Sequence, residues 1–137
     1  MSGDLSSNFP GGLERLQEKA ARLDPAECWN IGLDNLADMS YLDAIVYFGA
    51  LEKNPAYAEK IGLALSLANA GACHKGRMDC GMSQRLSYMH AYLVQACRQF
   101  DIALKTVPFP YNNQEGCALS SLYFSLVQVY QMRMDEQ

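Results

Sequence analysis

Residues 28–55 read CWNIGLDNLADMSYLDAIVYFGALEKNP, and the spacing of their apolar side chains decides the fold. In the second half these side chains recur at steps of three and four residues, which places them on one face of a helix. They are Tyr41, Ala44, Ile45, Phe48 and Leu51. The first half has its own apolar positions at Trp29, Ile31, Leu33 and Leu36. Asp38 to Ser40 separates the halves, and Pro55 ends the second because proline cannot continue a helix. The stretch therefore predicts two short amphipathic helices folded back on each other.

Four residues of this hairpin stand close to the spacing of the tetratricopeptide repeat. They are Gly32, Ala44, Phe48 and Pro55. The glycine lets the second helix approach closely, the alanine lies opposite it, and the phenylalanine fills the gap to the next repeat. Three positions differ from the pattern, because Trp29 lies one position late, Asn35 replaces the usual tyrosine and Pro55 comes one residue early. The hairpin therefore resembles this repeat, and a generic amphipathic helical hairpin is the alternative.

Further helical patterns lie on both sides of the hairpin. Residues 13–23 carry a leucine stripe, and residues 56–70 repeat the Ile-Gly pair of the hairpin at Ile61-Gly62. Residues 83–107 restore the repeat pattern in their second half, and residues 114–134 read as the first helix of an incomplete third repeat. The glycine-rich stretch 70–83 predicts a loop or insertion in the second repeat.

These segments together predict an all-α fold of tetratricopeptide-like helical hairpin repeats with about six helices. We expect residues 1–12 to form a flexible tail, because they are polar and contain Pro10-Gly11-Gly12. Residues 13–137 then form one helical-repeat domain, since their number suits a single hydrophobic core.

Composition limits the classes of function. Half of the 137 residues are hydrophobic, so the chain is globular rather than disordered. Its formal net charge of −4 argues against binding to a nucleic-acid backbone, which requires clustered Lys and Arg. No apolar run approaches the roughly 20 residues of a membrane span. The first residues lack the basic start and apolar stretch of a secretory signal, so we expect a cytoplasmic location.

The five cysteines are odd in number and spread along the chain, and we read them as free, mostly buried thiols. They are Cys28, Cys73, Cys80, Cys97 and Cys117. Cys73, His74 and Cys80, with His90 as a fourth ligand, do not have the paired spacing of a structural zinc site. We therefore expect no metal and no cofactor.

Catalysis is not expected either. His90 and Cys97 lie seven residues apart, which on one helix separates them by about 10 Å along the axis and is too far for direct proton transfer. The sequence has no phosphate-binding glycine loop, and its carboxylates follow solvated helix faces. The chain is therefore predicted not to be an enzyme.

Large apolar residues on the first helix of the hairpin are the best candidates for a binding site. In the repeat register Trp29, Leu33 and Leu36 face the inner curve of a stacked array. They are either core contacts to residues 13–23 or a groove for a peptide, and the sequence leaves both open. Three further residues extend the same candidate surface: Tyr57, Leu65 and Tyr92.

Residues 31–71 resemble a particular family, the tetratricopeptide-type chaperones of bacterial type III secretion that look after translocator proteins. The matching positions are Ile31-Gly32, Tyr41, Ala44, Phe48, Leu51, Ile61 to Ala64 and Gly71. The interruption after Gly71 and the short third repeat differ from the family pattern. The resemblance implies a cytosolic chaperone that keeps a secreted translocator or effector protein soluble. Its concave groove would hold an extended apolar segment, and Trp29, Leu33 and Leu36 would line it.

Two other functions fit the same pattern. One is a general tetratricopeptide adaptor that joins folded partners, and the other is an obligate subunit of a heteromeric complex, such as a needle-subunit co-chaperone. Exposed apolar residues also allow a homodimer, in which Leu13, Leu16 and Leu23 pack across subunits.

Overall fold

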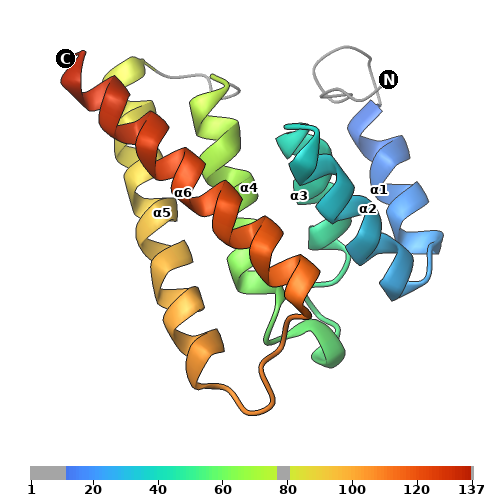
Figure 1. Cartoon of the computed structure of the whole chain (residues 1–137). Helices are drawn as coiled ribbons and strands as arrows, with labels where there is room; N and C mark the ends of the chain where they lie inside the picture. Colours follow the sequence, from blue (N-terminus) through green and yellow to red (C-terminus); the bar gives the residue numbers. More distant parts are fainter. Residues whose placement is uncertain (1–11, 77–80, 137) are drawn as a thin grey trace.

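The computed structural model describes residues 12–76 and 81–136, in which the chain forms α-helices and no strands (Figure 1). The helices are α1 (Gly12–Arg22), α2 (Pro25–Ala37), α3 (Tyr41–Gly49), α4 (Ile61–His74), α5 (Met82–Lys105) and α6 (Asn113–Asp135), with a short 3₁₀ helix η2 (Pro55–Tyr57) before α4. Each of α2 to α5 packs against the helix that follows it, and α1 packs on α3. The prediction of an all-α fold with six helices is therefore confirmed.

One helix boundary differs from the sequence-based prediction. Residues 56–60 do not open the helix of the second repeat, because Pro55–Tyr57 forms η2 and the Asn54 side chain accepts a hydrogen bond from the Ala56 N–H (3.0 Å). Helix α4 begins at Ile61 and continues to His74, and α5 begins at Met82, so both ends of the expected loop at 70–83 are helical. Residues 77–80 of the expected loop lie outside the described part of the chain, as do residues 1–11 of the expected tail.

The leucine stripe of α1 docks mainly within the chain. Leu16 and Ala20 are buried, and α1 contacts α3. Leu23 is partly buried against the core, whereas Leu13 remains 43% exposed. Two of the three leucines proposed for a homodimer are therefore engaged inside one chain, and dimerisation through this stripe stays a prediction.

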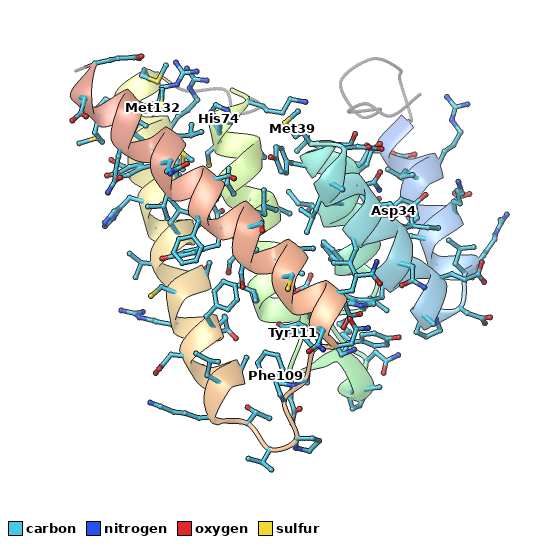
Figure 2. All side chains as sticks on the ribbon, viewed as in Figure 1. Asp34, Met39, His74, Phe109, Tyr111 and Met132 are labelled. Carbon is cyan, nitrogen blue, oxygen red and sulfur yellow. The ribbon has the colours of Figure 1, made fainter. Side chains whose placement is uncertain are left out.

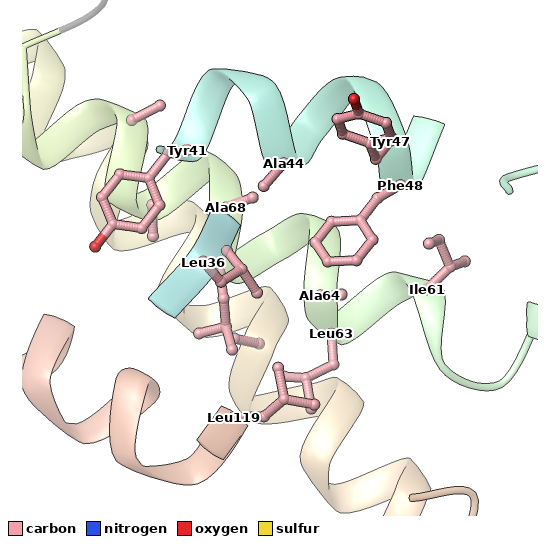
Figure 3. Packing of buried hydrophobic residues seen from close by; sticks show 14 of the residues in the cluster. Leu36, Tyr41, Ala44, Tyr47, Phe48, Ile61, Leu63, Ala64, Ala68 and Leu119 are labelled. Carbon is pink, nitrogen blue, oxygen red and sulfur yellow. The ribbon is translucent and has the colours of Figure 1, made fainter. Parts of the chain in front are cut away.

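Helix α4 is the centre of the core. It contacts α3, α5 and α6, and most of its residues are buried, so it lacks the single apolar stripe of a surface helix. Small side chains allow its neighbours to approach. Figure 3 shows Ala64 and Ala68 of α4 beside the helix that carries Ala44 and Phe48.

No helix in residues 12–76 and 81–136 combines the length and apolar character that crossing a membrane requires.

Glycine is required where α2 meets α3. A Cβ atom built on Gly32 would overlap the ring of Phe48, which is fully buried. The predicted close approach at this glycine is therefore present, and the Phe48 ring occupies the space that a side chain would need.

We expect Gly32→Ala to lower the free energy of unfolding by about 1–3 kcal/mol, because the added methyl group overpacks the α2–α3 contact. Gly49→Ala is the matched control, since its added Cβ would meet no atom closer than Glu52 Oε1 at 3.8 Å. Urea denaturation followed by circular dichroism measures both changes. Equal stability of the two variants would contradict the proposed packing.

Candidate partner-binding surfaces

Trp29, the first candidate groove residue, lies in the core and is only 3% exposed. Its indole contacts three aromatic rings, those of Phe48, Tyr57 and Tyr111, with centroid distances of 5.5, 5.9 and 6.5 Å. The Lys60 ammonium lies 5.3 Å from the centroid of the indole. Trp29 therefore lies in the core, and the rings that pack on it come from outside residues 13–23, the segment expected to cover it. Tyr57 belongs to the same ring cluster.

The indole N–H of Trp29 has a hydrogen-bond acceptor that is distant in the sequence. Trp29 Nε1 donates to Glu115 Oε2 at 2.6 Å. The other carboxylate oxygen accepts the Asn112 N–H (3.1 Å), while Asn112 Oδ1 accepts the Glu115 N–H (2.8 Å). This reciprocal pair is a capping box at the start of α6, and Lys60 Nζ lies 3.9 Å from the same carboxylate. The Glu115 carboxylate therefore caps the first turn of α6 and also connects this helix to α2 through Trp29.

Tyr111 closes the same cluster from the segment that leads into α6. Its ring is buried, and its hydroxyl donates to the Lys60 carbonyl oxygen at 3.0 Å. Burial, with a smaller effect of the Glu115 carboxylate, raises the pKa of Tyr111 far above its usual range. The phenol therefore stays neutral and acts as a fixed hydrogen-bond donor.

Helix α6, held at its first turn, crosses α4 (Figure 1). Residues of α2 and α6 line an apolar cleft between these two helices. The α2–α6 cleft has a volume of about 310 Å³. Leu33, Leu36 and Met39 line it from the α2 side, and Leu122 and Val129 line it from α6. Leu36 is buried and Leu33 partly buried, whereas Met39 is 56% exposed. The cleft is thus open at Met39 and apolar on both walls.

The six predicted groove residues do not form one surface. Leu33 and Leu36 meet at the α2–α6 cleft, and Trp29 and Tyr57 lie together in the ring cluster. Leu65 lines a separate hollow between α4 and α5 whose walls include Gln95 and Gln99. Tyr92 packs against the core from α5. Of the six, only Leu33 and Leu36 line the cleft whose opposite wall belongs to α6.

A second apolar surface, the α5–α6 groove, was not anticipated from the sequence. It consists of two adjoining hollows of about 610 and 560 Å³ that share Cys97 and Tyr123. Leu104, Phe124 and Phe109 line the first hollow and are 72%, 63% and 45% exposed. The signal in the sequence was the spread of apolar residues around all sides of residues 114–134, which exceeds one buried stripe.

Basic side chains gather at one end of the α2–α6 cleft. His74 ends α4 (Figure 2) and lines the cleft. Its Nδ1 atom is buried without a hydrogen-bond partner in the described part of the chain. Burial lowers the pKa of His74, and the nearby positive charges of Arg133, Lys75 and Arg85 lower it further. Lys75 Nζ donates to the Met39 carbonyl oxygen at 2.9 Å, which places this ammonium at the rim of the cleft.

Cysteine and histidine side chains form no joint site in the described residues. Cys28 and Cys73 are buried, but Cys97 and Cys117 are exposed, so the prediction of mostly buried thiols is wrong for these two. The His90 ring packs on Tyr130, whereas Cys97 contacts Tyr123. Residues 12–76 and 81–136 contain no group of three or more potential metal ligands, and Cys80 lies outside them.

Removing the Glu115 carboxylate should destabilise the protein, because both the cap of α6 and the acceptor of the Trp29 indole N–H are lost. Glu115→Ala deletes the capping box, worth about 1 kcal/mol, and leaves the indole N–H of Trp29 buried without an acceptor, which costs about 1–3 kcal/mol. We expect the free energy of unfolding to fall by about 2–4 kcal/mol in urea titrations. Glu136→Ala, an exposed change just beyond α6, is the control and should change stability by less than about 0.5 kcal/mol.

His74 should make the protein less stable in mild acid. Its pKa is lowered from the ordinary value of 6.5 in the folded chain, so below that pH the unfolded chain takes up a proton that the folded chain resists. The free energy of unfolding therefore falls as the pH drops from about 7 toward 5. His74→Gln should reduce this slope in thermal melts measured across the range, and an unchanged slope would contradict the assignment.

Comparison with known proteins identifies no family for this chain: no protein-family model matches it, and neither a curated protein nor a solved structure shows significant similarity to it. The all-α architecture and the two apolar surfaces on α6 are the observations on which a function can be proposed.

Proposed function

We propose that this protein is a chaperone that binds an apolar segment of a secreted partner protein in the α2–α6 cleft. The observation that carries the proposal is a preformed apolar cleft, open at Met39 and walled by Leu33 and Leu122. Its volume of about 310 Å³ lies at the lower end of the range for ligand sites. The resemblance of residues 31–71 to the tetratricopeptide-type chaperones of type III secretion is the reason for proposing a secreted protein as the partner.

The size of the cleft limits what it contributes to affinity. One buried aliphatic side chain gains about 1.5–3 kcal/mol, whereas micromolar binding requires about 8 kcal/mol after the cost of association. One or two anchors in the cleft are therefore insufficient alone. The partner segment must continue beyond the cleft, over the exposed part of Met39 and along α6.

Leu33→Glu tests this proposal, because it places a carboxylate in the apolar wall and should lower partner recovery at least tenfold. The tagged chain is used to capture proteins from the host lysate, followed by mass spectrometry and measurement of the affinity for the purified partner. Leu104→Glu is the matched control, since Leu104 is 72% exposed on the α5–α6 groove. Melting curves must show that both variants are folded. Equal recovery with Leu33→Glu and the unmodified chain would exclude the cleft.

A second function, that of an adaptor or obligate subunit of a heteromeric complex, is favoured by the α5–α6 groove. Phe124 and Leu104 expose most of their apolar surface there, and exposed aromatic groups mark interfaces more often than free surfaces. In the same capture experiment, loss of the partner with Phe124→Glu and its retention with Leu33→Glu would support this function instead.

A further inference from the structure

The α2–α6 cleft combines apolar walls with a positively charged end. His74 lines the cleft itself, and Lys75, Arg85 and Arg133 are the cations whose charges act on it. They come from the end of α4, the start of α5 and the end of α6. The whole chain has a formal charge of −4, so this gathering of basic groups is a local exception to the overall charge.

These cations have no carboxylate partner among the described residues. Within residues 12–76 and 81–136, the ion pairs include those of Arg22 with Glu18, Lys60 with Glu115 and Lys105 with Asp101. Asp135 and Glu136 lie close to Arg133 along the chain, and neither forms an ion pair with the four basic groups. Asp79, which lies between Lys75 and Arg85 in the sequence, is outside the described residues. The positive charge at this end of the cleft is therefore uncompensated by the part of the chain that the structure shows.

Two polar atoms at the same end are also unsatisfied. His74 Nδ1 and Arg85 Nε are buried and have no hydrogen-bond partner in the described part of the protein. The remaining Arg85 contacts are weak, since its Nη2 reaches only the sulfur of Met82 at 3.6 Å. Buried polar atoms without partners are uncommon in folded proteins, and an acceptor supplied by a ligand is one explanation for them.

We infer that the partner segment carries a carboxylate next to its apolar anchors, and that this carboxylate binds between His74, Lys75 and Arg133. This inference rests on the proposed function, because it assumes that the segment lies in the α2–α6 cleft. A carboxylate accepts hydrogen bonds from imidazole, ammonium and guanidinium groups, and each such bond is strengthened by charge. The carboxylate is either an Asp or Glu side chain or the free C-terminus of the partner.

A library of random 12-residue peptides, selected by mRNA display against the full chain, tests the inference directly, because the selection needs no identified partner. The selected peptides should combine apolar residues with an adjacent carboxylate. Lys75→Gln/Arg133→Gln should weaken their binding about tenfold, and raised salt should weaken binding to the unmodified chain. The matched control is Lys19→Gln/Arg22→Gln on α1, which changes the net charge equally at exposed positions that do not line the cleft.

The outcomes separate the inference from the proposed function. Peptides that require Leu33 but bind Lys75→Gln/Arg133→Gln as tightly as the unmodified chain would overturn the inference and leave the cleft intact. If no selected peptide loses binding with Leu33→Glu, the cleft itself is excluded. For peptides that meet the expectation, Glu→Gln or Asp→Asn within the peptide and amidation of its C-terminus identify which carboxylate is bound. Thermal melts show that each variant of the protein is folded.

Discussion

A buried indole N–H requires an acceptor, and Trp29 finds it on Glu115, 86 residues later in the chain. The same carboxylate completes the capping box of α6, so one side chain decides both where α6 begins and where its first turn lies. The aromatic rings around Trp29 exclude water from this contact, which strengthens it. The direction of α6 across α4 is therefore set at its start by this interaction and along its length by packing on α4 and α5.

That direction creates both candidate surfaces. The α2–α6 cleft uses Leu122 and Val129, whereas the α5–α6 groove uses Phe124 and Tyr123, and the helical period places these two pairs on opposite sides of α6. Leu119 and Leu126 lie between them and pack into the core. Any displacement of α6 therefore alters both surfaces together. The effect of a change at Glu115 on partner binding would not identify the surface used, and substitutions on the walls themselves are needed.

Local sequence patterns predicted most of the helices. They could not predict contacts between residues that are far apart in the sequence. The hairpin at 28–55 follows from apolar period and from Pro55, and the Asn112-x-x-Glu115 pattern of the capping box is also local. By contrast, the glycine content of residues 70–83 suggested a loop, although Gly71 lies within α4. Glycine is required at this helical position because the Tyr41 ring occupies the space where a side chain would be. Whether Trp29 faced a groove or the core depended on Glu115, and no local pattern contains that information.

The candidate site was predictable only in part for the same reason. Placing Leu33 and Leu36 on an inner face needs only the register of one helix, but the wall opposite them belongs to α6. Leu65 and Tyr92 are apolar like the other predicted groove residues, but they lie elsewhere. Leu65 lines a polar hollow between α4 and α5, and Tyr92 packs from α5 against the core. No helix within residues 12–76 and 81–136 covers the groove between α5 and α6. Its exposed Phe124 and Leu104 therefore have the chemistry of a helix interface, while the basic end of the α2–α6 cleft suits an extended segment with a carboxylate.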